Sequence, residues 1–221
     1  MKTFQELQEG LYDPNIFKAI FLAGGPGSGK SLVAGKATGG AGLKLVNSDP
    51  VFERMLAAAG LSKKMPPEEY ERKEMVRGKA KEVTARQRDN FIEGRLGLLI
   101  DGTGKDANKI LYQKNMLDEL GYDTYMIYVN TSVDVALQRN AERSRSLPND
   151  DVVKMWKAVQ NNIGQFSSMF RGNLIIVDNN DAGEDILNGI YKRVKGMLRK
   201  KVQTTRAKSW MASELAKKQR R

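Results

Sequence analysis

The clearest chemistry in the sequence belongs to a glycine-rich segment that ends in a lysine and a serine. Residues Gly24–Ser31 match the pattern Gly-x-x-x-x-Gly-Lys-Ser, a phosphate-binding P-loop, and they follow an apolar run, Ile20–Ala23. We expect backbone N–H groups and the N-terminal dipole of the following helix to bind the phosphates of ATP. The predicted nucleotide contacts in this loop are Gly25, Pro26, Gly27, Ser28, Gly29, Lys30 and Ser31.

Two side chains of the P-loop have distinct expected roles. Lys30 should reach the β- and γ-phosphates, and the Ser31 hydroxyl should be a ligand of Mg²⁺. The alternative is a glycine-rich turn that matches the pattern by chance. The preceding strand, the spacing and the Lys-Ser pair together favour nucleotide binding.

Two aspartates follow other apolar runs and are candidates for acid–base and metal chemistry. Asp49 comes two residues after Asn47, and we expect it to be the general base that deprotonates an acceptor hydroxyl. The alternative for Asp49 is a helix N-cap without a chemical role. Asp101 ends an apolar strand, and we expect it to hold Mg²⁺ or contact the acceptor. The alternative for Asp101 is an aspartate in a turn without a chemical role.

Three arginines supply the positive charge that phosphoryl transfer requires. Arg139 and Arg143 are four residues apart, on one face of an expected helix, and Arg145 follows where this helix gives way to a loop. We expect a helical lid over about residues 139–150 whose guanidinium groups close over the phosphates, with Arg139 and Arg145 binding the nucleotide. The alternative is an ordinary cluster of surface charge.

Apolar runs of strand length alternate with helix-favouring segments, and they must position these side chains. The expected strands are 20–23, 43–46, 96–100, 125–129 and 174–177. The expected helices are 31–37, 51–59, 66–94 with a possible break at Gly78, 106–120, 133–143, 150–169 and 181–200. Continuously apolar strands that alternate with helices indicate an α/β fold, a three-layer sandwich of the P-loop NTPase type with a five-stranded parallel sheet. Because ligands bind at the carboxyl ends of such strands, the P-loop, Asp49 and Asp101 should converge there.

Composition limits the chemistry and the class of protein. The chain has 221 residues and contains neither cysteine nor histidine, so acid–base work falls to carboxylates, and any metal should be a hard, oxygen-bound ion such as Mg²⁺. No apolar run is long enough to span a bilayer, and the first residues are too polar for a secretory signal. We therefore expect a cytoplasmic protein without membrane insertion.

The positive charge is concentrated at the C-terminus. Residues 192–221 contain twelve Lys or Arg and one acid, Glu214, whereas residues 1–191 carry 25 basic and 25 acidic residues and are neutral. We predict a kinase domain over residues 1–200 and a basic helical tail over 201–221. Such a tail suggests binding to a polyanion, for example nucleic acid. The alternative is a solvated end that only keeps the protein soluble.

Together, these motifs resemble the group of P-loop kinases that contains the polynucleotide 5′-hydroxyl kinases and the zeta toxins. The residues that carry the resemblance are the P-loop, Asn47-x-Asp49, Asp101-x-Thr103, and Gln138-Arg139-Asn140 with Arg143 and Pro148. It covers about residues 17–178 and implies a five-stranded parallel sheet. It also implies a base at Asp49, an active-site role for Asp101 and a catalytic lid arginine at Arg143. The source is expected to be a phage or a bacterium.

Three functions are compatible with these observations. The first is an ATP- and Mg²⁺-dependent kinase that phosphorylates a nucleic-acid 5′-hydroxyl. The second is a small-molecule kinase that acts on a nucleotide sugar or a nucleoside monophosphate. The third, from another class, is a P-loop nucleic-acid-binding NTPase without kinase activity. The sequence does not determine the acceptor, the oligomeric state or the role of the tail.

Overall fold

A parallel sheet of five strands forms the centre of the molecule. The structure is a computed structural model that describes residues 10–62, 66–143, 146–181 and 183–219. The strands are β1 (Lys18–Ala23), β2 (Lys44–Val46), β3 (Leu98–Asp101), β4 (Asp123–Asn130) and β5 (Leu174–Asp178). They pair in the order β2-β3-β1-β4-β5, and every pair is parallel. The predicted α/β fold is therefore confirmed.

Helices cover both faces of this sheet because side chains alternate along each strand. On β1, Ile20 and Leu22 face α2 (Lys30–Thr38) and α9 (Glu184–Arg199), whose buried residues join the same apolar core. Phe21 and Ala23 on the opposite face pack in the core that includes residues of α5 (Ala107–Glu119), α7 (Asn149–Asn161) and α8 (Ile163–Phe170). These layers place β1, which carries the P-loop, in the middle of the sheet.

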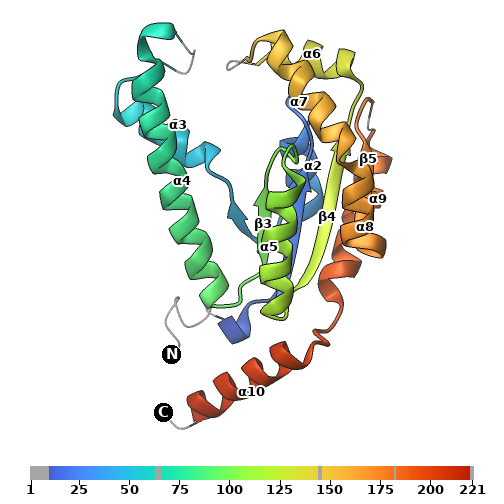
Figure 1. Cartoon of the computed structure of the whole chain (residues 1–221). Helices are drawn as coiled ribbons and strands as arrows, with labels where there is room; N and C mark the ends of the chain where they lie inside the picture. The colour runs from blue at the N-terminus through green and yellow to red at the C-terminus, as the bar shows by residue number, and fades with distance from the viewer. Residues whose placement is uncertain (1–9, 63–65, 144–145, 182, 220–221) are drawn as a thin grey trace.

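A helical pair extends from the β2 edge and has a small core of its own (Figure 1). The two helices are α3 (Asp49–Ala58) and α4 (Tyr70–Glu93), and the short 3-10 turn η2 (Pro67–Glu69) comes directly before α4. The core contains Val51, Phe52, Leu56, Leu61 and Ala80. The helix α4 continues through Gly78, so the break that the sequence suggested there does not occur. The unbroken helix α4 therefore runs along the side of the sheet (Figure 1).

Two regions predicted to be helical differ from the prediction in the structure. The single helix predicted over residues 150–169 is two helices, because the chain changes direction at Asn162, whose side-chain amide donates to the Gly104 carbonyl (2.9 Å). The helix predicted over 133–143 is α6 (Val133–Ala141), and Arg143 lies in the turn after it. Its N–H donates to the Asn140 carbonyl (3.3 Å). Arg139 and Arg143 therefore do not share a helical face.

The C-terminal segment forms a docked helix, α10 (Thr205–Gln219). Ala207 of α10 is fully buried in the main core, and the Trp210 ring meets Phe17 edge-on with ring centres 5.5 Å apart. Phe17 and the 3-10 turn η1 (Gly10–Tyr12) precede β1, so α10 lies at the amino ends of the strands, away from the P-loop (Figure 1). Among the described residues, no helix is both long and apolar enough to cross a membrane.

Candidate active site

The P-loop joins β1 to α2 and is held in shape by glycines that have left-handed backbone angles. Gly27 (φ 73°) and Gly29 (φ 81°) adopt a conformation that side chains with a Cβ disfavour. A Cβ on Gly27 would collide with the backbone of Ala136 in α6, and one on Gly29 would collide with the Asn179 amide. The glycines therefore allow α6 and the end of β5 to pack directly against the loop.

Lys30 begins α2, and its ammonium group folds back over the loop. The Nζ atom donates to the carbonyl oxygens of Gly24 (2.7 Å) and Gly25 (3.3 Å). Burial lowers the pKa of Lys30, and the nearby Arg143 lowers it further, while Asp101 and Asp49 act in the opposite direction. Negative phosphates at this point would stabilise the charged form of Lys30.

Asn47 links the two predicted aspartates at the carboxyl ends of β2 and β3. The Asn47 amide donates to Asp101 Oδ2 (2.7 Å), and its oxygen accepts from the backbone N–H of Asp49 (2.8 Å). Burial raises the pKa of the Asp101 carboxyl, Lys30 lowers it, and Asp49 raises it. The structure thus brings Lys30, Asp49 and Asp101 into one electrostatic group, as the strand-end argument predicted.

Asp49 is the first residue of α3, and Ser48 occupies the N-cap position without a side-chain capping bond. Asp49 therefore is not the N-cap that the alternative interpretation assumed. Its side chain is exposed to solvent at the start of the helix. This position leaves the carboxylate accessible to an acceptor.

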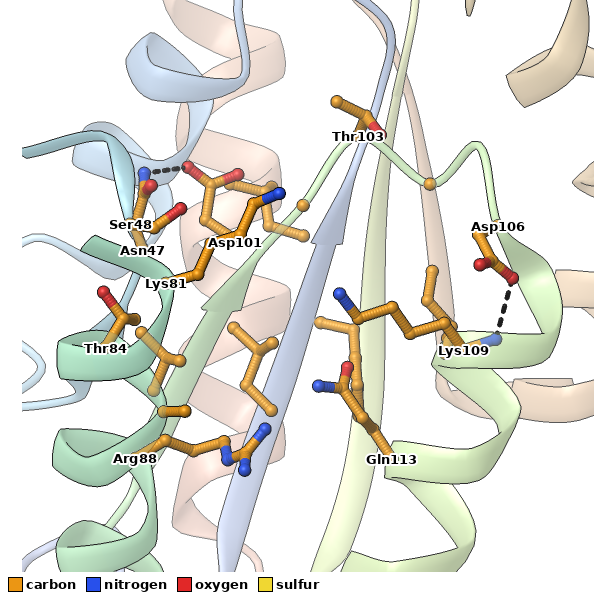
Figure 2. Close-up of a pocket in the computed structure, with 18 of the residues that line it drawn as sticks. Asn47, Ser48, Lys81, Thr84, Arg88, Asp101, Thr103, Asp106, Lys109 and Gln113 are labelled. Atoms are coloured by element: carbon orange, nitrogen blue, oxygen red, sulfur yellow. Dashed lines mark hydrogen bonds between the residues drawn. The ribbon is translucent and has the colours of Figure 1, made fainter. Parts of the chain in front are cut away.

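A pocket of about 470 Å³ opens beside this group, between α4 and α5 and against β3. Figure 2 shows Asp101, Asn47 and Ser48 at one end, with Arg88 and Gln113 toward the other. Apolar side chains of the sheet, including Phe21, Val46 and Ile100, are part of the lining. Its charged lining residues are Lys81, Arg88, Asp101, Lys105, Asp106 and Lys109.

The pocket is positively charged. Of its two acids, Asp106 caps α5 by accepting from the Lys109 backbone N–H (2.9 Å), and Asp101 lies at the end next to Lys30. Four cations, two on α4 and two on or just before α5, remain around the space in between. The pocket can therefore accommodate a compact molecule that carries negative charge.

The second side of the P-loop is formed by the ends of β4 and β5. Arg139 of α6 donates to the carbonyls of Asn179 (2.8 Å) and Asn180 (3.1 Å) and lies next to Gly29. The Asn179 amide donates to the Ser28 carbonyl (2.7 Å). Arg139 therefore braces the wall of the nucleotide site in this structure, and a direct nucleotide contact remains a prediction.

Of the two other predicted lid arginines, Arg143 belongs to the described part of the chain. Arg143 is exposed after α6 and is close enough to Lys30 to influence its pKa. Arg145 lies outside the described residues. A lid function for residues 139–150 stays a prediction.

Several residues of the site were not among those predicted from the sequence. Lys81 and Arg88 are seven residues apart on α4, a spacing that places both on one helical face, but the helix as a whole is densely charged and gave no reason to select them. Asn179 directly follows β5, so the strand-end argument that found Asp49 and Asp101 would have found it too. Trp156 of α7 packs its backbone near Gly25, and its indole donates to the Thr131 carbonyl (2.8 Å).

The predicted magnesium ligands suit a metal that is shared with phosphates. Oδ1 of Asp101 is buried and has no hydrogen-bond partner among the described residues, and the Ser31 side chain is exposed at the loop. No group of three or more acidic side chains gathers anywhere in the described part of the chain. This donor set fits Mg²⁺, which commonly takes one or two protein ligands and completes its shell with phosphate oxygens and water.

Known structures share the fold over most of this chain. A candidate kinase from Chloroflexus aurantiacus J-10-fl is 18% identical with a TM-score of 0.59, covering 82% of this chain and 98% of the other. A shikimate kinase from Bacteroides thetaiotaomicron is 13% identical with a TM-score of 0.52 (83% and 99% covered). A gluconokinase from Sinorhizobium meliloti 1021 is 12% identical with a TM-score of 0.52 (83% and 95% covered). At these identities the likeness establishes the fold.

Sequence comparison identifies the family. The family model for the zeta toxins matches residues 13–189, which include the P-loop, Asp49, Asp101 and the arginines of the predicted lid. A comparison with curated proteins found no match. The zeta-toxin part of the predicted resemblance is confirmed, whereas the polynucleotide-kinase part and a phage origin remain predictions. The chain belongs to the zeta toxin family and is a phosphotransferase with the P-loop kinase fold.

Proposed function

We propose that this protein is an ATP- and Mg²⁺-dependent kinase that transfers the γ-phosphoryl group to a hydroxyl of a compact, negatively charged acceptor. The observation that carries the proposal is the cationic pocket beside Lys30 and Asp101. Its volume of about 470 Å³ lies in the range of small-molecule sites. The acceptor would enter between α4 and α5, while ATP would lie on the P-loop.

The residues at the junction of the two sites suit in-line phosphoryl transfer. Lys30 would leave the carbonyls of Gly24 and Gly25 and bind the phosphates, and Arg143 would add positive charge from the turn after α6. Ser31 and Asp101 would hold Mg²⁺, which neutralises phosphate charge when bound. Asp49 would accept the proton of the acceptor hydroxyl.

The acceptor pocket supplies the charge that selects the substrate. Lys81 and Arg88 on α4 face the pocket together with Lys109 of α5 (Figure 2). Cations that surround a partly apolar floor would bind a phosphate or carboxylate group of the acceptor and orient its hydroxyl toward Asp49 and Asp101. A sugar phosphate, a nucleoside monophosphate and a nucleotide sugar all meet these requirements.

A nucleic-acid 5′-hydroxyl is the second candidate acceptor. Lys81 and Arg88 on α4, together with Lys109 on α5, would also suit successive phosphates of a strand end. The basic tail no longer supports this candidate, because α10 packs at the opposite end of the sheet and contributes no residue to the pocket.

The test is transfer of labelled γ-phosphate from ATP to a panel of acceptors. The panel contains sugar phosphates, nucleoside monophosphates, UDP-N-acetylglucosamine and a 5′-hydroxyl oligonucleotide, with Lys30→Ala as the blank. Label on a small anionic acceptor supports the proposal, and label only on the oligonucleotide establishes the second candidate. Failure to label any acceptor, although ATP binds, would count against a kinase of either kind.

Paired variants of α4 test the acceptor pocket directly. Lys81→Ala/Arg88→Ala should raise the KM for the acceptor about tenfold or more and leave the KM for ATP unchanged. Lys79→Ala/Arg86→Ala is the matched control, since both residues are exposed on the same helix with the same spacing and do not line the pocket. Equal effects of the two pairs would exclude the pocket as the acceptor site.

A further inference from the structure

Exposed cations are concentrated in the second half of α9, in the connection to α10 and on α10 itself. They comprise ten residues, all exposed: Lys192, Arg193, Lys195, Arg199, Lys200, Lys201, Arg206, Lys208, Lys217 and Lys218. We call this the basic surface. Four of its residues lie on α9, two in the connection to α10 and four on α10. Figure 1 shows the course of these elements. Glu214 is the one acid in residues 192–221, and it pairs with Lys217 (2.7 Å).

Tertiary contacts fix α10 in place, so the basic surface has a defined shape. The Thr204 hydroxyl donates to the Gly121 carbonyl (2.9 Å), and the Arg206 guanidinium donates to the Glu119 carbonyl. The Trp210 ring packs on Phe17 and lies under the Arg95 guanidinium, 5.7 Å from the ring centre. The four cations of α10 therefore project from a docked helix rather than from a free end.

The outward side of α10 is polar. The buried or partly buried apolar residues of this helix, Ala207, Trp210 and Met211, all belong to the core of the protein. Among the exposed positions are Ser209, Ala212, Ser213 and Ala216, which are small, and Leu215 is the large apolar residue there. A helix that lies on a membrane needs an exposed apolar face, and a protein interface usually has an apolar centre. The basic surface has neither feature.

We infer that the basic surface binds the phosphate backbone of a nucleic acid without reading its sequence. A helix of this length measures about 22 Å, which spans several consecutive phosphates of a strand. Lysines predominate on the surface, and they act as mobile point charges that suit a backbone of variable position. Small side chains between the cations let the backbone approach closely.

This binding would be independent of phosphoryl transfer. The part of the basic surface on α10 lies at the amino ends of the strands, whereas the P-loop, Asp49 and Asp101 lie at the carboxyl ends. A bound strand would therefore keep the enzyme on a nucleic acid while both the ATP site and the acceptor pocket stay open. Such binding is compatible with a small-molecule acceptor and with a nucleic-acid acceptor.

The experiment measures binding of the full-length protein to a fluorescein-labelled, single-stranded DNA of about 20 nucleotides. The DNA carries a 5′-phosphate, and ATP is omitted, so it cannot serve as a phosphoryl acceptor. Replacing Lys192, Lys200, Lys201 and Lys208 by Gln should weaken binding at about 0.1 M salt at least tenfold. A plot of the logarithm of the association constant against the logarithm of the salt concentration should become less steep by about 2.8. Each phosphate of a single strand that a lysine neutralises contributes about 0.7 to this slope, and four lysines are replaced.

Two comparisons make the result specific. A variant with Lys36, Lys79, Lys154 and Lys157 replaced by Gln removes the same charge from exposed positions elsewhere and should bind within about twofold of the unmodified protein. Both variants should keep the unmodified melting temperature and kinase activity. Equal weakening by the two variants, abolished binding in Lys81→Ala/Arg88→Ala instead, or binding only to vesicles of anionic lipid would each overturn the inference.

Discussion

At the scale of single residues, the site is a balance between one partly buried cation, Lys30, and two carboxylates. Burial lowers the pKa of Lys30 and raises that of Asp101, so each charge is costly without the other. Asp49 influences both groups from the start of α3. A bound nucleotide would add negative charge beside Lys30. We therefore expect nucleotide binding to stabilise the charged form of this lysine.

Asp49→Asn tests the proposed general base. The amide keeps the size of the side chain but cannot accept the hydroxyl proton, so kcat should fall about 100-fold or more while nucleotide affinity is retained. The measurements are steady-state kinetics on the identified acceptor and calorimetric titration with a non-hydrolysable ATP analogue.

Asp101→Asn is the comparison for this variant. It should lower kcat and also raise the Mg²⁺ concentration required for half-maximal activity, because Asp101 is the proposed metal ligand. If kcat is unchanged in Asp49→Asn and no longer depends on pH in Asp101→Asn, then Asp101, not Asp49, is the general base.

Asp13→Asn tests a buried carboxyl far from the chemistry. Asp13 accepts hydrogen bonds from the N–H groups of Asn15 (2.7 Å) and Gly97 (3.3 Å), and burial raises its pKa above the ordinary 3.8. Because the pKa of Asp13 is higher in the folded than in the unfolded protein, its carboxyl group stabilises the fold fully below the ordinary pKa of 3.8. This stabilisation is lost as the pH rises through the folded-state pKa. The stability of Asp13→Asn relative to the unmodified protein should therefore increase with pH across that window and then level off.

Urea unfolding at a series of pH values measures this difference. Asp106→Asn is a suitable control, because Asp106 is exposed at the N-cap of α5. Parallel stability curves for Asp13→Asn and the unmodified protein would contradict the assignment.

At the scale of elements, the ends of four strands build the two halves of the site. β1 leads into the P-loop, β2 leads to Asp49 at the start of α3, β3 ends at Asp101, and β5 is followed by Asn179, which contacts the loop. The helices then decide which side chains face the ligands. α4 and α5 line the proposed acceptor pocket, and α6 and α7 pack against the P-loop.

Asn179→Ala tests how β5 supports the P-loop. The Asn179 amide donates to the Ser28 carbonyl and lies against Gly29, so its removal should loosen the loop and weaken nucleotide binding about tenfold. Titration with an ATP analogue measures the affinity. Asn180→Ala, at the exposed neighbouring position, is the control for the same loop. Unchanged affinity in Asn179→Ala would show that β5 does not hold the loop.

At the scale of the whole molecule, the proposed active site and the helix α10 of the basic surface occupy opposite ends of one sheet. Phosphoryl transfer is assigned to the carboxyl ends of the strands, and α10 lies at the amino ends. The net charge of +11 arises entirely from residues 192–221, whereas the rest of the chain is neutral. This separation makes it possible to remove the basic surface by mutation without touching the catalytic residues.

Trp210→Ala tests whether α10 is part of the folded body. Trp210 packs on Phe17 in the main core, so the truncation should cost about 3 kcal/mol of unfolding free energy, the low end of the range for a tryptophan because its side chain is only partly buried. Leu215→Ala on the exposed side of α10 should cost below about 0.5 kcal/mol. Chemical denaturation of both variants checks the difference, and equal costs would mean that α10 does not stabilise the fold.

The sequence alone determined the features that depend on local pattern. The P-loop spacing, the apolar strands and the positions of Asp49 and Asp101 after them were sufficient to predict the α/β fold and the end of the sheet where the site forms. This works because the side-chain alternation of strands and the conformational freedom of glycine are properties of short segments. Even so, the break at Asn162 and the end of α6 at Ala141 were not predictable, since tertiary contacts such as the Asn162–Gly104 bond help to set them.

Only the tertiary structure decided which charges face one another. Lys81 and Arg88 are distant in sequence from Asp101 and Lys109, and their convergence on one pocket depends on how α4 and α5 are rotated and packed against the sheet. Likewise, only the burial of Ala207 and the packing of Trp210 against the core showed that α10 is a docked helix at the far side of the molecule. Such arrangements follow from packing among many non-local side chains, and no short segment of the sequence specifies them.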